Sequence, residues 1–524
     1  MSNFEPFIPL SNLEQKFEAW RVRIGLVLAP VVFFAVLWMP WSASAPVASA
    51  PSASEGAAST LAALKPEAHR LAAIMTTVVL LWVTEALPMP VTALLGAAAC
   101  VLLRVAEPKE VFSPFADQLM FLFIGSFILA RGIFLHGLDR RLAFGVMSWS
   151  WVGARPGRIL FAFGAVTAFI SAWISNTATT AMMLAIGVSI LRFLFESPET
   201  QGKIDRRYAT GLALMTSFSA SIGGLATPIG TPPNVIGLRF IRDSLGVEIP
   251  FLNWMLIGVP VVIVLYLFLF AYLNFFCPAG MKELPGSREL LQRNRAELGP
   301  WTRGQISTVI AFGTTVLLWV FPGIVALIWG ETSSTYEAVR KSLPEGVAAI
   351  LGAVLLFLLP GKPGENAIGW KEAAQIDWGV VLLYGGGFAL GELSNKTGLA
   401  DAVGRGMATW LPVSGEFGLL LGGTLVAALV SEATSNTASA NIVVLLVIKM
   451  AQAAGVDPVA PALGATFGAS LGFMLPVSTP CNAIVYGTGY VPLTRMIRYG
   501  LLLDVVGVGV IVVMIQLLLP LIRS

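Results

Sequence analysis

Long apolar runs restrict what this chain can fold into more than any other feature of its sequence. Several reach the roughly 20 residues that a helix needs to cross the hydrocarbon core of a bilayer. Of the 524 residues, 56% are hydrophobic and 12% are charged, whereas a soluble globular protein carries about 25% charged residues. The runs are continuous and lack the alternation of a membrane β-barrel strand. The sequence therefore predicts an all-α polytopic membrane protein.

About eleven transmembrane helices are expected. They lie near residues 24–40, 69–86, 90–105, 117–138, 208–240, 251–277, 305–325, 344–360, 378–400, 459–492 and 499–521. Arg21 and Arg23 precede the first run and small residues follow it, a pattern that imitates a cleaved signal peptide. Because the polar leader is long, we expect an uncleaved span followed by a flexible Ala/Ser/Pro loop over residues 42–60.

Two further apolar segments, 158–194 and 416–454, carry the same tripeptide near their middles. It reads Ser175-Asn176-Thr177 in the first and Ser435-Asn436-Thr437 in the second. Each segment is either one long helix with a polar patch or a re-entrant hairpin whose tip lies at membrane depth. Non-helical backbone survives there only against protein or a water-filled cavity. Two copies in register favour the hairpin.

The two halves of the chain match at further positions. A Thr-Pro-X-Asn turn follows each tripeptide, as Gly230-Thr231-Pro232-Pro233-Asn234 and Ser478-Thr479-Pro480-Cys481-Asn482. Leu87-Pro88 recurs 256 residues later as Leu343-Pro344, and Gly125 recurs 261 residues later as Gly386. The tripeptides are 260 apart and the turns 248 apart. These offsets predict two structural repeats.

Lys and Arg residues in short loops predict the orientation. They crowd the loops on both sides of the first hairpin, at 140–158 and 203–207, and the loops at 282–303 and 495–498. The second hairpin region, 416–457, holds only Lys449. We therefore expect the hairpins to enter from opposite faces in an inverted repeat. The N-terminus would be cytoplasmic and the C-terminus outside.

The tips and turns predict a site for a cation and an anion. Hydroxyl, amide and free backbone carbonyl oxygens suit a small alkali cation. Helix N-termini at the Pro-containing breaks present N–H groups that suit an anion. No Lys or Arg lies in either motif, so co-bound cations would offset the cost of burying an anion. Paired broken helices of this kind form the binding sites of many secondary transporters.

Other features exclude several functional classes. The net charge of +3 gives no sign of a nucleic-acid partner, and the three cysteines (Cys100, Cys277, Cys481) have no metal-type spacing. An intramembrane hydrolase would need a nucleophile with a His or acidic partner, and no His lies near either tip. Glu85 and Glu392 stand at span ends and are interpreted as structural or interfacial. Glu432, beside a tip, is either a functional carboxylate or part of the hairpin's polar packing.

With these motifs, the sequence resembles the divalent anion–sodium symporter family, the dicarboxylate, citrate and sulfate carriers. The resemblance runs from about Leu71 to Leu518 and includes Trp82-Val-Thr-Glu-Ala-Leu-Pro-Met-Pro-Val-Thr92. It implies a homodimer in the inner membrane whose transport domain moves as an elevator against a scaffold domain. No cofactor is implied beyond co-transported sodium ions.

The resemblance also implies which residues bind. One sodium site would use Ser171, Ser175, Asn176 and the Gly230 carbonyl; the other would use Ser431, Ser435, Asn436 and the Ser478 carbonyl. The anion would contact Ser175, Asn176, Thr177, Ser435, Asn436, Thr437, Thr479 and Pro480. Cys481 replaces the second proline of the first turn, and Ser431 stands where relatives often have Thr.

The expected organisation alternates scaffold and transport parts. It runs as 1–23 (cytoplasmic segment), 24–116 (first scaffold), 117–250 (first transport part), 251–304 (linking helix and charged loop), 305–377 (second scaffold), 378–498 (second transport part) and 499–524 (last helix). The leading hypothesis is sodium-coupled symport of a C4-dicarboxylate such as succinate, fumarate or malate. A sodium-independent dicarboxylate exchanger and a sodium-coupled sulfate or citrate carrier remain open, and the charged insertion 282–297 has no assigned role.

Overall fold

The computed structural model describes residues 12–39, 65–330, 332–410 and 415–523. The expected Ala/Ser/Pro loop at 42–60 lies outside these residues. The first quarter of the chain forms α1 (Asn12–Trp38), α2 (Pro66–Thr84), α3 (Met89–Leu102), α4 (Pro108–Phe112), η1 (Ser113–Ala116) and α5 (Gln118–Leu135). It continues with α6 (Leu138–Met147), α7 (Pro156–Ser171), α8 (Asn176–Glu196), α9 (Arg206–Gly223), η2 (Gly224–Ala226), α10 (Pro232–Leu245), α11 (Phe251–Phe276) and α12 (Ser287–Glu297).

The second half repeats this order. It forms α13 (Arg303–Trp329), α14 (Ser334–Ser342), α15 (Glu345–Leu358), α16 (Trp370–Ala373), α17 (Trp378–Thr397), α18 (Leu399–Trp410), α19 (Gly415–Ala433), α20 (Asn436–Ala453), α21 (Val459–Gly468), α22 (Pro480–Tyr486) and α23 (Leu493–Arg523). Ten helices in the described part are long and apolar enough to cross a membrane, or eleven if the bent pair α14–α15 counts as one span. The prediction of an all-α polytopic membrane protein is confirmed.

Two of the expected spans are interrupted where the Thr-Pro-X-Asn motifs predict helix breaks. The span at 208–240 is broken between α9 and α10, and the span at 459–492 is broken between α21 and α22. Both breaks lie just before a Thr-Pro-X-Asn motif, where proline removes a hydrogen-bond donor. The segments at 158–194 and 416–454 form helical pairs, α7–α8 and α19–α20, with the tripeptides at the turns.

The repeats are visible as identical contacts made twice. A Cβ added at Gly125 of α5 would lie 2.5 Å from the carbonyl carbon of Ala349 on α15, and one at Gly386 of α17 would lie 2.6 Å from the Cβ of Ala93 on α3. Gly125 and Gly386 are 261 apart, and Ala93 and Ala349 are 256 apart, the two offsets found in the sequence. Helix α5 of the first repeat therefore packs on α15 of the second, and α17 of the second repeat packs on α3 of the first.

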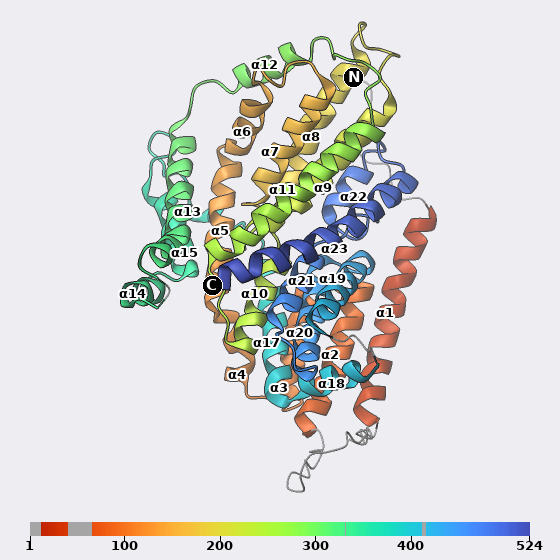
Figure 1. The fold of residues 1–524 in the computed structure, drawn as a ribbon, viewed down its shortest axis with the longest axis vertical. Helices are drawn as coiled ribbons and strands as arrows, with labels where there is room; N and C mark the ends of the chain where they lie inside the picture. Colours follow the sequence, from red (N-terminus) through yellow and green to blue (C-terminus); the bar gives the residue numbers. More distant parts are fainter. Residues whose placement is uncertain (1–11, 40–64, 331, 411–414, 524) are drawn as a thin grey trace.

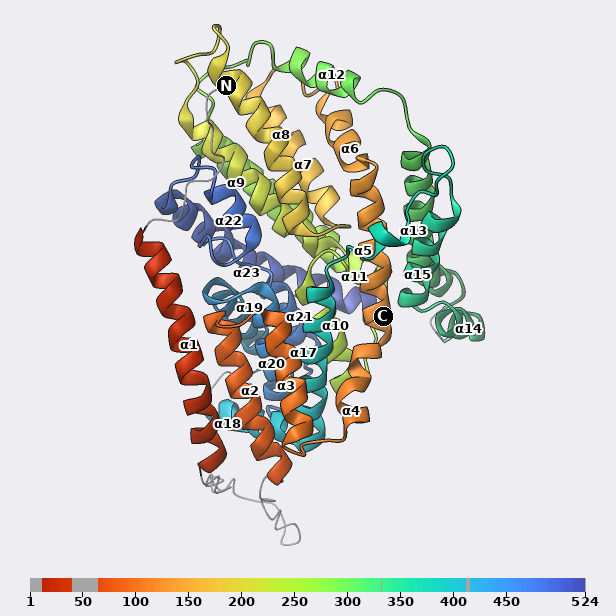
Figure 2. The same ribbon diagram turned by 180° about the vertical axis from the view of Figure 1, so that it is seen from behind.

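The helices pack into two groups. The scaffold group comprises α1–α5 and α13–α17, in which α5 packs most closely on α15 and α17 on α3. The tip group comprises α6–α12 and α18–α23, in which hairpin α7–α8 packs on α9 and hairpin α19–α20 on α21. Within the scaffold group, α13–α15 lie at one edge of the molecule and α1 lies along the opposite edge (Figures 1 and 2).

Helix α9 lies at the centre of the tip group. Its residues from Tyr208 onward, with the following turn to Ala226, are all buried and are rich in Ala, Ser and Gly. Small side chains let neighbouring backbones approach closely. A Cβ added at Gly223, for example, would lie 2.2 Å from the Ala168 carbonyl oxygen of α7. This packing fixes the first hairpin against the broken helix beside it.

The close contact of α5 with α15 predicts a matched pair of glycine variants. We expect Gly125→Ala to destabilise the protein by about 1–3 kcal/mol, since the added methyl group overlaps backbone atoms of Ala349. Gly145→Ala on α6 is the control, because nothing lies within 4 Å of a Cβ there and Ala favours a helix by about 1 kcal/mol. Melting temperatures of the purified variants test this. Equal melting temperatures would contradict the contact.

Candidate functional site

The two broken helices are held by the same hydrogen bonds. The Asn234 side-chain amide donates to the Gly224 and Thr227 carbonyls at 2.9 and 2.8 Å. The Asn482 amide donates to the Gly472 and Leu475 carbonyls at 2.9 and 3.0 Å. Every atom of the second set lies 248 residues after its counterpart. Backbone carbonyls that lose a helical partner at membrane depth need a replacement, and the Asn of each Thr-Pro-X-Asn motif supplies it.

At the first tip, oxygen atoms converge on one amide. The buried Ser171 hydroxyl, at the end of α7, donates to Asn176 Oδ1 at 2.7 Å. The same amide position lies 3.2 Å from the Ala220 carbonyl oxygen and 3.1 Å from that of Gly230. With nitrogen at this position, its two hydrogens face all three oxygens and can donate to them. With oxygen there, four oxygens face one another, an arrangement that a cation would stabilise.

The second tip repeats this arrangement 260 residues later. The buried Ser431 hydroxyl lies 2.7 Å from Asn436 Oδ1 and 2.8 Å from the Ala469 carbonyl oxygen. The Asn436 amide nitrogen lies 3.5 Å from the Ser470 carbonyl oxygen. Hydroxyl, amide and backbone oxygens are the ligand types that hard cations prefer. Each tip therefore has an oxygen cradle suited to an alkali cation.

A glycine lies beside each cradle, where a side chain would approach the cradle oxygens. A Cβ added at Gly224 would lie 2.6 Å from Asn176 Oδ1 and 3.1 Å from the Gly230 carbonyl oxygen. A Cβ at Gly472, its counterpart 248 residues later, would lie 3.1 Å from Asn436 Oδ1 and 3.2 Å from Ser431 Oγ. A side chain at either position would occupy space beside the oxygens, more severely in the first cradle.

Both tips line one cavity of about 1700 Å³. All eight residues expected to contact the anion line it: Ser175, Asn176, Thr177, Ser435, Asn436, Thr437, Thr479 and Pro480. Gly230 and Ser478 also line it, whereas Ser171 and Ser431 are completely buried beneath it. The structure thus brings together residues that are up to about 300 positions apart in the sequence.

Helix N-termini surround this cavity. Ser175 and Ser435 are the N-cap residues of α8 and α20, and Thr231 is the N-cap residue of α10. Ser435 accepts a hydrogen bond from the Ala438 amide, while Ser175 makes no such side-chain bond. Unsatisfied N–H groups and the positive end of the helix dipole favour an anion in this position.

The cavity wall includes charged and polar residues outside the repeated motifs. Arg131 of α5 donates to the Gln375 side-chain oxygen, and Asp377 lies nearby at the start of α17. Arg21 forms a 2.6 Å ion pair with Glu85. Arg131 is not among the site residues predicted from the sequence, although a single Arg within an apolar run is a signal of a functional position.

Glu432 fixes the backbone of the second break. Its carboxylate accepts hydrogen bonds from the Met474 and Leu475 amides at 2.7 and 3.3 Å and from the Ser478 hydroxyl. The side chain is buried at 4% exposure. These partners belong to the break between α21 and α22 and not to the hairpin itself, so the contacts fit a polar packing role that joins the hairpin to the break. The equivalent position in the first tip is Ala172, so the two breaks are stabilised differently.

Comparison with known proteins agrees with this architecture. Residues 59–522 match the family model described as "Sodium:sulfate symporter transmembrane region".

The chain belongs to this family.

Family members include two staphylococcal relatives named "Sodium-dependent dicarboxylate transporter SdcS". The one from Staphylococcus saprophyticus is 33% identical, with 84% of each chain covered. One from Staphylococcus aureus (strain bovine RF122) is 30% identical, with 98% of this chain and 94% of the relative covered. Among solved structures, the fold is similar to that of MtrF from Neisseria gonorrhoeae (TM-score 0.54, 13% identity, 94% of each chain). It is also similar to the YdaH transporter of Alcanivorax borkumensis (TM-score 0.50, 13% identity, 96% of this chain and 98% of that one).

The contacts of Glu432 predict a loss of stability in Glu432→Gln. The amide would place a donor against backbone N–H groups, leaving a buried donor unsatisfied at a cost of about 1–3 kcal/mol. Glu416→Gln, at the exposed start of the same helix, is the matched control and should melt like the parent protein. The measurement is thermal unfolding in detergent. An unchanged melting temperature for Glu432→Gln would show that these hydrogen bonds contribute little.

Proposed function

We propose that this protein is a secondary active transporter that couples sodium to the movement of a C4-dicarboxylate such as succinate, fumarate or malate. The observation that carries the proposal is a single cavity with an oxygen cradle at each of two tips and helix N-termini between them. Ser171, Ser175, Asn176 and the Gly230 carbonyl would bind one sodium ion. Ser431, Ser435, Asn436 and the Ser478 carbonyl would bind the other.

The absence of Lys and Arg from both motifs explains why transport would need sodium. A dicarboxylate carries two negative charges, and moving it from water into a low-dielectric site is costly without compensation. Two sodium ions in the cradles would neutralise those charges at short range. The relatives named as sodium-dependent dicarboxylate transporters support this choice of cation and anion over the exchanger.

The packing supports an elevator mechanism with a particular boundary. The hairpins and broken helices all belong to the tip group, so the site would move with that group. Helices α5 and α17 were expected in the transport part, but they pack most closely on α15 and α3 of the scaffold group. We therefore draw the moving boundary after α5 and after α17, near Gly137 and Gly398. A homodimer formed through the scaffold group stays a prediction.

The cavity also fits the expected orientation in the inner membrane. With the N-terminus inside, Arg131 near the end of α5 and Asp377 at the start of α17 both lie toward the cytoplasm. These residues line the cavity, so it would open inward. The hairpin α7–α8 would then enter the membrane from the cytoplasm and α19–α20 from outside.

Uptake in proteoliposomes tests the function. We expect labelled succinate to accumulate when sodium is present outside empty vesicles, and not when choline replaces it. Equal initial rates in the two buffers would exclude coupling. A strict requirement for dicarboxylate inside the vesicles would favour the exchanger. The description of the family model names sulfate, so sulfate and citrate are tested as competitors of succinate uptake. If either inhibits uptake more strongly than fumarate does, that anion replaces the dicarboxylate as the proposed substrate.

The unequal space beside the cradles predicts unequal glycine variants. We expect Gly224→Ala to raise the sodium concentration needed for half-maximal uptake about tenfold or more, since its Cβ would lie 2.6 Å from Asn176 Oδ1. Gly472→Ala should have a smaller effect, because its nearest contact is 3.1 Å. Uptake is measured against sodium concentration at equal protein amounts. A larger effect at Gly472 would contradict the assignment of the two cradles.

A further inference from the structure

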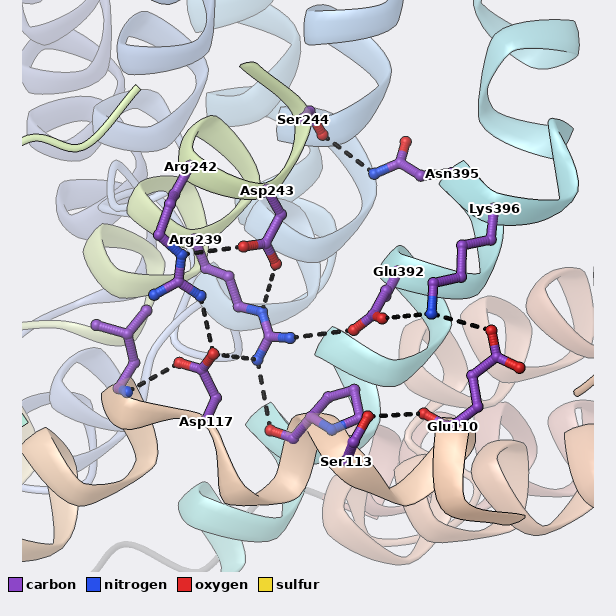
Figure 3. Close-up of polar contacts among 12 residues, drawn as sticks. Glu110, Ser113, Asp117, Arg239, Arg242, Asp243, Ser244, Glu392, Asn395 and Lys396 are labelled. Carbon is purple, nitrogen blue, oxygen red and sulfur yellow. Dashed lines mark hydrogen bonds and ion pairs between the residues drawn. The ribbon is translucent and has the colours of Figure 1, made fainter. Parts of the chain in front are cut away.

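A cluster of seven charged side chains joins the tip group to the scaffold group, away from the cavity. It contains three cations (Arg239, Arg242, Lys396) and four carboxylates (Glu110, Asp117, Asp243, Glu392), which meet between α10, α17 and the α4–α5 segment (Figure 3). We call these seven residues the ion cluster. None of them lines the cavity.

Arg239 of α10 is the centre of the ion cluster. Only 3% of it is exposed, and its guanidinium lies 3.7 Å from Asp117 and 3.6 Å from Glu392. It also lies 4.0 Å above the ring of Phe388 on α17 and forms a 2.8 Å pair with Asp243 of its own helix. A buried cation needs such partners, because losing one leaves an uncompensated charge. The shortest of these contacts is within α10, and the other three are with side chains of the scaffold group.

Other contacts reinforce the same interface. Arg242 pairs with Asp117 at 2.8 Å, and the Asn395 side chain donates to the Ser244 hydroxyl at 3.1 Å. A Cβ added at Gly391 would lie 2.4 Å from the ring of Phe240, so α10 and α17 touch directly. Lys396 differs, because its partners Glu110 and Glu392 both belong to the scaffold group.

The ion cluster and the charged part of the cavity lie at opposite ends of the same two helices. On α5, Asp117 precedes the first residue and Arg131 is near the end, about 21 Å away at 1.5 Å per residue. On α17, Asp377 lies at the start and Glu392 about 22 Å further along. The molecule is therefore open at the end with Arg131 and closed at the end with Arg239.

The inverted repeat shows that the two closures cannot be equal. The offset of 248 relates Arg239 to Gly487, and the offset of 261 relates Glu392 to Arg131. Asp117 has a counterpart in Asp377, 260 residues later, which is likewise the N-cap residue of its helix. Gly487 and Tyr490, however, stand where α10 has Arg239 and Arg242, and residues 487–492, which follow α22, contain no charged side chain. The cavity end therefore lacks a counterpart to the two α10 cations of the ion cluster.

We propose that the ion cluster is a conformational latch: its contacts between α10 and the scaffold group favour the arrangement seen here and must separate before the site can open at the other end. The inference rests on the proposed transport function for its purpose, but not for its test. On this proposal the arrangement seen here is the resting state, because the two α10 cations that pair across the moving boundary have no counterpart in the second repeat.

The test measures how often this interface opens. Ser394 of α17 is 2% exposed and lies one helical turn from Gly391, on the face that meets α10. Ser394→Cys is introduced into a chain whose three cysteines are replaced by alanine. Its rate of reaction with a membrane-impermeant maleimide then reports the open fraction, without sodium or dicarboxylate present.

Asp117→Asn with Glu392→Gln should raise this labelling rate about tenfold or more, the effect of about 1.4 kcal/mol on the opening equilibrium. Asn at position 117 keeps the helix cap that Asp117 provides to the Leu119 amide. Glu110→Gln is the matched control, since it removes a charge from the same ion cluster without touching α10. It should label like the parent protein.

Equal labelling rates in the three proteins, all monodisperse and melting within a few degrees of each other, would overturn the latch. Acceleration by Glu110→Gln as large as that of the double variant would overturn it too, because the effect would be one of net charge. If the double variant does not fold, Arg242→Gln, which loses the 2.8 Å pair with Asp117, is measured with the same expectations. Sodium-independent succinate uptake would refute the proposed function and leave the labelling result standing.

Discussion

The hydrogen bonds of Asn234 and Asn482 across the two helix breaks are the interaction on which the rest of the site depends. Each amide satisfies two backbone carbonyls that a regular helix would have paired internally. Without them, the non-helical segments 227–231 and 469–479 would expose unpaired carbonyls at membrane depth, at several kcal/mol each. With those groups satisfied, the Gly230 and Ser478 positions are free to line the cavity beside the tips.

The two halves share their polar motifs and differ in helix length and in charge. Equivalent Ser–Asn pairs, glycines and Asn bridges form the two cradles, whose backbone oxygens and free space differ. Glu432 supports only the second break, where the first has Ala172, and the ion cluster closes only one end of the molecule. In the proposed mechanism, pseudo-symmetry would let the site face either side, and the ion cluster would make one arrangement more stable than the other.

The sequence predicted those parts of the site that consist of local motifs. The tripeptides, the Thr-Pro-X-Asn turns and the constant offsets predicted the all-α fold, the repeats and the set of residues that line the cavity. It did not predict that α5 packs on α15 and α17 on α3, because an offset shows which residues are equivalent and not which ones touch. The sequence predicted breaks in the spans at 208–240 and 459–492, but not that the non-helical segments extend several residues before the proline.

The ion pairs between residues far apart in the chain could not be predicted from the sequence either. Arg239 lies more than 100 positions from both Asp117 and Glu392, so no spacing rule connects them, and the sequence suggested only a structural or interfacial role for Glu392.

The central claim is that sodium supplies the positive charge that the tips lack. Equilibrium binding of labelled succinate to the purified protein, titrated with sodium against a choline background, tests it most directly. The account predicts that affinity rises steeply with sodium; the same affinity in sodium-free buffer would contradict it.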